Sequence, residues 1–374
     1  MDRQSTDALS RPMRRRTLLR MTALSGASML GAQALAACGG GSDAGGGASS
    51  SATLRMMNYP GWMGENEVAE FRATHPGFKL KQITGGANST AEIVSLIAQN
   101  TEAYDFGLMD LPAGGQLKAG GFIEALDESQ VPNLAQVDPR FRDAFTEIGM
   151  PQDYGIVGIA WRRDLVKQPI TSWEDLWKLA PSYRGRIVVV DYDDLVLGTA
   201  LKYLGRSFNS DSEADLAAAA DALKELKPSI QAFKEVDTSR PLIGDNPSAA
   251  ISIDFNFSVA QVQRRDPRIE YVVPAEGAPG YLEGWGIVRG TQHRDLIHEF
   301  MNFHLEPRNY ATFLEATGNL SIMRSAVPLV DPSLRNAQAF NPSSADLDRV
   351  EFSRYVSPER LALMSRHFEE VKGS

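Results

Sequence analysis

After residue 52, short apolar runs that suit strands alternate with longer stretches in which apolar residues recur every three or four positions. The longer repeat is that of an amphipathic helix, and the short alternating runs are typical of strands. Strands are predicted at 52–59, 78–84 and 104–110, with a helix in each gap and a further helix and turn at 116–126. This order builds an open sheet whose ligands lie beyond the ends of the strands.

Two capping boxes, each a Ser or Thr followed three residues later by Glu, indicate where helices begin. Ser89 and Glu92 precede Ile93, and Thr171 and Glu174 precede the segment DLWKLAPSYRG. Apolar residues at helical spacing follow the first box, so we expect a helix to start there, and a second helix to start at Thr171.

A second series of elements follows in the same style. Strands are predicted at 186–191, 249–255 and 269–274, and helices at 212–228, 258–265, 293–307, 309–318 and 357–372. The glycine-rich stretch 274–290 is interpreted as a loop. About 320 residues follow the first 52, which is long for one core and suits two lobes. The pattern predicts an α/β protein of two lobes, each an open mixed sheet flanked by helices.

The N-terminus has the charge and hydropathy order of an export signal. A cationic patch at 14–20 precedes a mostly apolar stretch at 21–37, and Arg15 and Arg16 resemble the twin-arginine signal. The four residues 35–38 resemble a bacterial lipobox that ends in Cys38, the single cysteine of the chain. We expect a signal peptide at 1–37, a lipid on Cys38 and a flexible Gly/Ser tether at 38–52. A cleaved signal without lipid and export by the Sec route are the alternatives.

The net charge changes the expected partners. The leader carries six Arg and two acidic residues, so its removal takes the net charge from −9 to −13. An acidic surface disfavours nucleic acid and anionic lipid, and it favours a cationic ligand. No later stretch is apolar and long enough for a membrane helix, so the lipid alone would hold the chain at a membrane.

The common catalytic motifs are missing from the sequence. There is no GxSxG, GxxxxGK, HExxH or CxxC motif. His298 and His304 are six residues apart, a spacing that places them on opposed faces of a helix, so they are a poor chelating pair. Few candidates for a catalyst therefore remain, and we expect no cofactor and no metal.

Several segments, taken together and in order, carry a resemblance to a known family. They are LRMMNYPGW, AYDFGLMD with LKAGGFIEAL, TSWEDLW with YRGRIVVVD, ALKYLG, and VVPAEGAPGYLEGWGIV with FMNFHLEP. Over roughly residues 53–372 the chain resembles the periplasmic spermidine/putrescine-binding proteins of ABC importers.

The resemblance implies a two-lobed periplasmic-binding-protein clamshell of type II-like topology, with a small solute trapped between the lobes. Lobe 1 would comprise 53–155 and 283–325, and lobe 2 would comprise 156–282 and 326–374. It also implies a monomer that hands its solute to importer membrane subunits, in the periplasm or on the outer face of the cell membrane.

The family binds ammonium groups with carboxylates and stacks the alkyl chain on aromatic rings. Carried over by position, the ligand-binding residues are Tyr59, Trp62, Asp110, Asp191, Asp254, Tyr281, Glu283 and Asn319.

The chain also departs from the family pattern. Pro60 and Gly61 replace a Thr and an acidic residue, Asp254 falls at a Trp position and Asn319 at a Tyr position. Carboxylates are retained in number but moved, and several rings are lost. The sequence thus predicts a polyamine-like cationic solute. The alternatives are another small solute, such as an amino acid, an opine or a carboxylate, and an exported enzyme that uses carboxylates such as Asp191 and Asp254.

Overall fold

The computed structural model describes residues 52–84, 89–235, 240, 242–244 and 247–374. The predicted signal peptide, the lipobox with Cys38 and nearly all of the tether lie outside these residues. Within the described ranges, no helix has the length and apolar character needed to cross a membrane.

Strands of the described segments form one continuous path of neighbours, β2-β1-β3-β10-β5-β8-β6-β7, with β4, β9, β11 and β12 attached beside it. The strands are β1 (Thr53–Met57), β2 (Lys79–Ile83), β3 (Phe106–Asp110), β4 (Ile123–Glu124), β5 (Met150–Arg162), β6 (Ile187–Val190), β7 (Ile230–Lys234), β8 (Ile251–Phe255), β9 (Ile269–Val272), β10 (Ala278–Val288), β11 (Leu320–Ser321) and β12 (Val350–Phe352). The sheet is mixed: β1 is parallel to β2 and β3, whereas β10 is antiparallel to β3 and β5.

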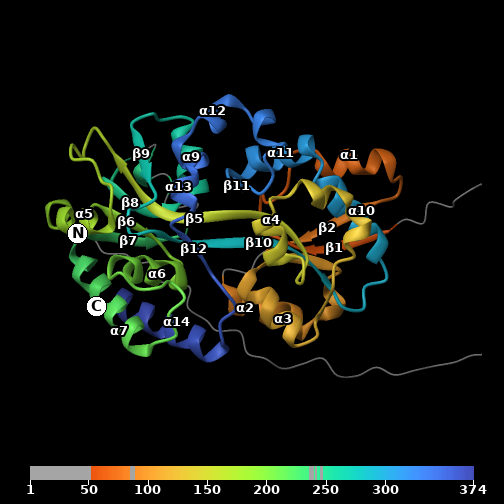
Figure 1. Ribbon diagram of the computed structural model, residues 1–374, viewed down its shortest axis with the longest axis horizontal. Coiled ribbons are helices and arrows are strands. Elements are labelled where there is room, and N and C mark those ends of the chain that lie inside the picture. Colours follow the sequence, from red (N-terminus) through yellow and green to blue (C-terminus); the bar gives the residue numbers. More distant parts are fainter. Residues whose placement is uncertain (1–51, 85–88, 236–239, 241, 245–246) are drawn as a thin grey trace, which may run out of the picture. The chain divides into compact units, whose positions relative to one another are not determined.

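The long strands β5 and β10 run through the centre of the described chain (Figure 1). β5 pairs with β10 up to Ile156, and from Val157 onward it pairs with β8 and β9 instead. One strand therefore belongs to both ends of the sheet, and its partners change between two adjacent residues.

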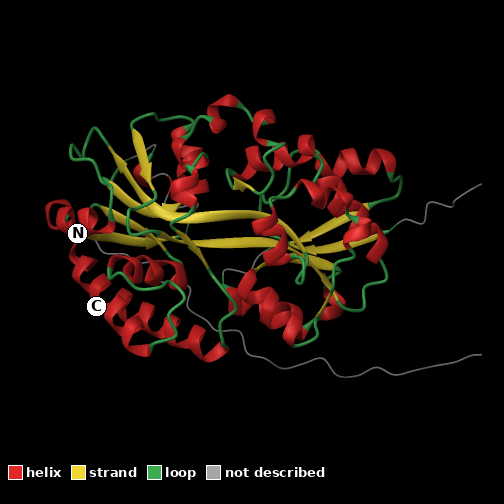
Figure 2. Ribbon diagram, in the orientation of Figure 1, coloured by secondary structure: helices red, strands yellow, loops and turns green. Residues whose placement is uncertain are grey.

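Helices lie on both sides of the strands (Figure 2). The α-helices are α1 (Glu67–Thr74), α2 (Thr90–Gln99), α3 (Leu111–Ala119), α4 (Pro139–Phe145), α5 (Trp173–Leu179), α6 (Asp193–Tyr203), α7 (Glu213–Leu226), α9 (Asn256–Gln263), α10 (Arg294–His304), α11 (Pro307–Thr317), α12 (Pro332–Arg335), α13 (Ser344–Leu347) and α14 (Pro358–Gly373). Short 3-10 helices are η1 (Thr101–Ala103), η2 (Glu128–Gln130), η3 (Pro132–Gln136), η4 (Ala180–Tyr183), η5 (Lys227–Ser229), η6 (Val327–Leu329) and η7 (Gln338–Phe340).

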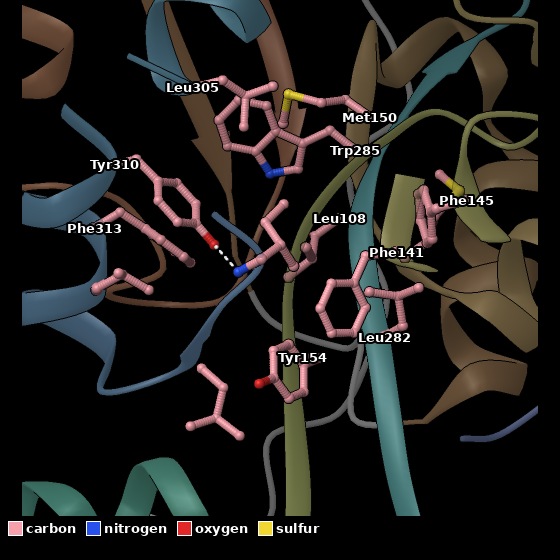
Figure 3. Close-up of a cluster of buried hydrophobic side chains, with 14 of the residues drawn as sticks. Leu108, Phe141, Phe145, Met150, Tyr154, Leu282, Trp285, Leu305, Tyr310 and Phe313 are labelled. Atoms are coloured by element: carbon pink, nitrogen blue, oxygen red, sulfur yellow. Dashed lines mark hydrogen bonds between the residues drawn. The ribbon is translucent and has the colours of Figure 1, made fainter. Parts of the chain in front are cut away.

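Buried apolar side chains gather in two clusters, one on each part of the path. In the first cluster, Trp285 of β10 lies beside Met150 at the paired position of β5 (Figure 3). The Trp285 ring also stacks on Phe300 of α10, with ring centroids 5.7 Å apart. The second cluster contains the fully buried Trp173 of α5 and Ile187, Val189 and Val190 of β6, a β-branched strand whose four residues are all buried.

Three sequence predictions are corrected by the backbone. The glycine-rich stretch 274–290 is not a loop, because its residues 278–288 form the central strand β10. The helix at 116–126 begins earlier, at Leu111, because the Asp110 side chain accepts a hydrogen bond from the Ala113 N–H and caps it. The capping residue of α5 is Ser172 rather than Thr171, since the Ser172 side chain accepts from the Asp175 N–H. By contrast, Ser89 caps α2 as predicted.

Candidate solute-binding site

A cavity of about 360 Å³ opens among the ends of several strands. Its volume lies in the range of sites that take small molecules. It is lined by Tyr59, Pro60, Gly61, Trp62, Asp110, Val190, Asp191, Tyr192, Asp194, Leu195, Glu235, Arg240, Phe255, Phe257, Tyr281, Glu283, Ala316, Thr317 and Ser353. Both parts of the strand path supply this lining, since β3 and β10 contribute from one part and β6 and β8 from the other.

The turn after β1 brings two aromatic side chains to the cavity. Asn58 is buried and its side-chain amide donates to the Trp62 carbonyl at 2.8 Å and to Gln82 at 3.1 Å. Gly61 has φ of 77°, a conformation that favours glycine, and the Trp62 N–H closes the turn on the Tyr59 carbonyl at 3.2 Å. The turn is therefore built to hold Tyr59 and Trp62 in fixed positions.

The aromatic rings form a continuous row along the cavity. Tyr59 meets Trp62 edge to face with centroids 5.7 Å apart, and Trp62 meets Phe257 at 5.1 Å. Phe257 stacks on Phe255 at 5.2 Å, and Phe255 meets Tyr281 at 5.6 Å. Such a row offers ring faces and edges to alkyl chains and to cations.

Two carboxylates from adjacent strands lie at one side of the row. Glu283 of β10 is paired with Asp110 of β3, and both are only 7% exposed. Asp110 accepts from the Thr90 hydroxyl at 2.6 Å and from the Ala113 N–H at 2.7 Å. The Glu283 Oε2 atom, in contrast, is buried and accepts no hydrogen bond from the described residues.

A second carboxylate group comes from the loop after β6 and the start of α6. Asp191 is partly exposed and pairs with Lys372 of α14 at 3.1 Å. Asp194 accepts from the neighbouring Leu195 N–H at 2.7 Å. Both line the cavity, so carboxylates from two parts of the strand path face the same space.

The crowding of acidic groups raises their pKa values. Burial raises the pKa of Glu283 well above its ordinary value, and repulsion from Asp153 and Asp110 adds to this. Burial, with repulsion from Asp193 and Asp110, raises the pKa of Asp194 to about 8. Because a nearby cation would favour the charged carboxylates, this electrostatic environment suits a positively charged solute.

Comparison with known proteins assigns the family. The family model of the bacterial extracellular solute-binding proteins matches residues 67–341. The chain belongs to this family. A spermidine/putrescine-binding periplasmic protein of Salmonella typhimurium is 23% identical over 330 residues, which cover 87% of this chain and 93% of the relative.

Two further relatives cover the chain to the same extent. A putrescine/cadaverine-binding protein of Pseudomonas aeruginosa is 22% identical over 338 residues, or 87% of this chain and 95% of the relative. Among solved structures, a spermidine/putrescine ABC transporter substrate-binding protein of Streptococcus pneumoniae has a TM-score of 0.74 at 23% identity, and the match covers 86% of this chain and 98% of that one. The two-lobed periplasmic-binding-protein fold predicted from the sequence is thereby confirmed.

Membership of the solute-binding family also confirms that the chain is a binding protein rather than an enzyme. The Salmonella typhimurium and Escherichia coli relatives are named as periplasmic proteins, which fits the predicted location outside the cytoplasm.

Six of the eight predicted ligand-binding residues line the cavity of this solute-binding protein. They are Tyr59, Trp62, Asp110, Asp191, Tyr281 and Glu283. The other two, Asp254 and Asn319, are buried outside the lining. Asn319 accepts a hydrogen bond from the Tyr281 hydroxyl at 3.1 Å. It therefore contacts a residue that lines the cavity without lining the cavity itself. Asp254 accepts from the Phe255 N–H at 2.8 Å, while the next side chain, Phe255, faces the cavity.

Several further residues were not assigned to the site from the sequence: the rings of Tyr192, Phe255 and Phe257 and the carboxylates of Asp194 and Glu235, which line the cavity, and Asp153, which does not. Phe255 and Phe257 line the cavity, and alternation along β8 could have indicated that Phe255 points to the opposite face from Asp254. Asp153 lies beside Glu283 on β5. The available signal for Asp153 was an acidic residue inside the mostly apolar stretch 150–162.

Proposed function

We propose that this family member is the lipid-anchored binding component of an ABC importer and that it captures a polyamine-like cation in the cavity. The lipid would be carried by Cys38 after removal of residues 1–37. The protein would then act in the periplasm or on the outer face of the cell membrane, tethered by residues 38–52, and deliver its solute to importer membrane subunits. The lobes would comprise 53–155 with 283–325, and 156–282 with 326–374.

The observation that carries this proposal is that a row of rings and several carboxylates line one cavity. Asp110 and Glu283 come from one part of the strand path, and Asp191 and Asp194 from another. An ammonium group removed from water requires opposite charge and hydrogen-bond acceptors, whereas methylene groups pack well on rings. A chain of methylenes that carries ammonium groups has both the charge and the apolar surface that this lining complements.

The relatives support the same class of solute. The relatives of Salmonella typhimurium and Pseudomonas aeruginosa carry names for the binding of spermidine, putrescine or cadaverine. Because identity is 22–23%, and because the carboxylates have moved relative to the family pattern, the proposal names a class of solute rather than one polyamine.

A second candidate is a solute that has a carboxylate as well as an ammonium group. Arg240 also lines the cavity and is the observation that favours it. A guanidinium group binds carboxylates in a two-point fashion, so an ω-amino acid could span from Glu283 to Arg240.

A thermal-shift screen separates these candidates. We expect putrescine, cadaverine or spermidine to raise the melting temperature in a saturable way, with the solute recovered unchanged. A shift with 4-aminobutanoate and none with the diamines would favour the second candidate. A shift only with dicarboxylates would reject both.

A further inference from the structure

A β-bulge in β5 places the Asp153 carboxyl group next to Glu283, which is itself paired with Asp110. Glu283 pairs with Asp153 and the next residue of β10, Gly284, pairs with Pro151, so Gln152 is the extra residue of β5. Because residues opposite each other in antiparallel strands project to the same face, Asp110, Glu283 and Asp153 form a row across β3, β10 and β5. Bulges commonly re-aim a side chain in this way near functional sites.

The bulge is held in place by buried polar contacts. The Tyr310 hydroxyl of α11 donates to the Gln152 carbonyl. The Gln152 side-chain nitrogen lies 3.4 Å from His304 Nε2, and His304 Nδ1 lies 2.7 Å from Glu67 Oε1. Since Gln152, His304 and Glu67 are fully or almost fully buried, Asp153 is fixed beside Glu283 by the core of the protein.

Within the described ranges, neither Asp153 nor Glu283 has a partner that could balance a charge on its carboxyl group. Asp153 is 0% exposed, and neither of its oxygens accepts a hydrogen bond from the part of the chain that the structure describes. The Trp62 indole N–H lies near Asp153 but does not reach hydrogen-bond geometry. No ion pair among the described residues involves Asp153 or Glu283. Two unpaired charges buried side by side would cost several kcal/mol.

The described titratable groups around Asp153 and Glu283 supply no positive charge to these carboxyl groups at neutral pH. Asp110 on β3 and Asp194 on α6 are acidic. Tyr59 after β1, Tyr281 on β10 and Tyr310 on α11 stay neutral, because burial raises the pKa of each phenol. Tyr192 before α6 and Tyr154 on β5 are neutral for the same reason. His304 on α10 is occupied by Glu67. Arg240 also lines the cavity, but its charge does not contribute to the pKa shift of Asp153 or of Glu283. A proton is the remaining counter-charge.

We propose that Asp153 and Glu283 share one proton in the solute-free protein and release it to the solvent when an ammonium group binds at Glu283. The O–H bond of the shared acid breaks, its electron pair stays on the carboxylate, and the proton passes to water or buffer. This inference rests on the proposed function, because it requires a solute with an ammonium group. It assigns Asp153, which does not touch the cavity, the role of setting the charge of the site.

The pKa directions agree with this exchange. Burial raises the pKa of Asp153 well above its ordinary value, and the pKa of Glu283 is raised in the same way. An adjacent ammonium group lowers both values, so binding expels the proton. By linkage, affinity then rises with pH by up to about tenfold per pH unit below the raised pKa of the pair, and it becomes constant above that pKa.

Calorimetric titration with putrescine tests the exchange on the wild-type protein. The titration is run at one pH in phosphate and in Tris, whose ionisation enthalpies differ, so the difference in heat counts the protons released. We expect a release approaching about one proton per putrescine bound. Asp153→Asn should abolish most of this release and flatten the rise of affinity with pH.

Asp138→Asn is the matched control. Asp138 caps α4, and Asn is an equally good capping residue, so the fold should be unaffected. Hydrogen bonds from Arg140 outweigh burial and hold the pKa of Asp138 low, so it is ionised with or without solute. This variant should release as many protons as the wild type does.

The failures of the two proposals are distinguishable. Equal heats in the two buffers, with putrescine bound tightly, would overturn the shared proton and leave the proposed function intact. Wild-type release that persists unchanged in Asp153→Asn would overturn the role of Asp153. If neither putrescine nor any other amine binds, the proposed function is wrong and the proton exchange falls with it.

Discussion

The Tyr281 ring lies across Gly155 on the neighbouring strand, so closely that a Cβ atom at position 155 would stand 2.3 Å from the ring. Real side chains do not tolerate that separation. The absence of a side chain at Gly155 therefore lets Tyr281 lie against β5 and face the cavity. Gly155 also lies at the predicted boundary between the two lobes, and its contact with Tyr281 gives a reason for glycine at this position.

Gly155→Ala should weaken solute binding, although Gly155 does not itself line the cavity. The added methyl group forces the Tyr281 ring away from β5 and into the space of the solute. Overpacking of this kind also costs about 1–3 kcal/mol of stability. Calorimetric titration and thermal unfolding measure the two effects.

Gly185→Ala is the control for that experiment. Gly185 has φ of 65° and nothing within 4 Å of a built Cβ, so the substitution strains the backbone and meets no ring. It should lower stability by about 1 kcal/mol and leave binding unchanged. Equal binding by both variants would show that the Gly155–Tyr281 contact does not shape the site.

Glu283→Gln should weaken binding of a cationic solute more than Tyr281→Ala. Removing one partner of a desolvated charge pair costs about 2–5 kcal/mol, or roughly thirtyfold or more in affinity. Loss of the ring contact should cost about 1–2 kcal/mol. Tyr281→Phe, which loses only the hydrogen bond to Asn319, should stay close to wild type.

The order of those losses is the informative result. A solute with a negative group at Glu283 would bind the Gln variant better, because like-charge repulsion is removed. Unchanged or tighter binding by Glu283→Gln would therefore reject the polyamine-like assignment, although the family and fold would stand.

Glu351 should make stability fall as the pH is lowered from about 5 to 2. Burial alone would raise its pKa, but hydrogen bonds from Ser207, the Phe208 N–H and Asn209, with the charge of Lys202, bring the pKa to about 2. A carboxyl whose folded pKa is depressed stabilises the fold above its unfolded pKa and loses that contribution as the pH falls. The contribution is at most about 3 kcal/mol.

Thermal unfolding of Glu351→Gln across this pH range measures the effect. The variant should be less stable than wild type at pH 7, and the difference should shrink toward pH 2. Glu174→Gln, at an exposed pair with Lys178, should follow the wild-type curve. A gap between Glu351→Gln and wild type that is constant with pH would contradict this account.

Cys38→Ser should release the folded protein from membranes. A diacyl anchor at the N-terminus would hold the chain at a lipid surface, whereas Ser at position 38 cannot carry the thioether-linked lipid. Fractionation and mass spectrometry of the intact protein test this. A Ser variant that still sediments with membranes, beside a wild type without lipid, would exclude the anchor.

Saturating solute should make the protein more compact. We expect the hinge near 154–158 and near 280–285, because the predicted lobe boundaries fall there; the first segment lies in β5 and the second in β10. Closure of two lobes about these crossings reduces the radius of gyration in small-angle scattering. An unchanged radius under conditions where calorimetry reports full binding would count against a hinge there.

The periodicity of the sequence alone indicated most elements of this fold. Strand and helix patterns are local, because they arise from the two- and 3.6-residue repeats of the backbone, so a run such as that of β6 or the amphipathic α10 can be read without its neighbours. The aromatic turn at Tyr59 and the carboxylate at Glu283 were also predicted, because LRMMNYPGW and GYLEGW resemble segments in which the family binds its solute.

The tertiary structure decided which side chains share one space. Gly280, Gly284 and Gly286 made β10 look like a loop, because glycine has a low strand propensity. In the folded protein, these glycines leave room for neighbouring segments of the chain, which propensity does not take into account. The pairing of Asp110, Glu283 and Asp153 depends on three strands far apart in sequence and on a bulge of one residue at Gln152. Register of this kind is set by packing across the sheet, and a shift of one residue would turn Asp153 to the opposite face.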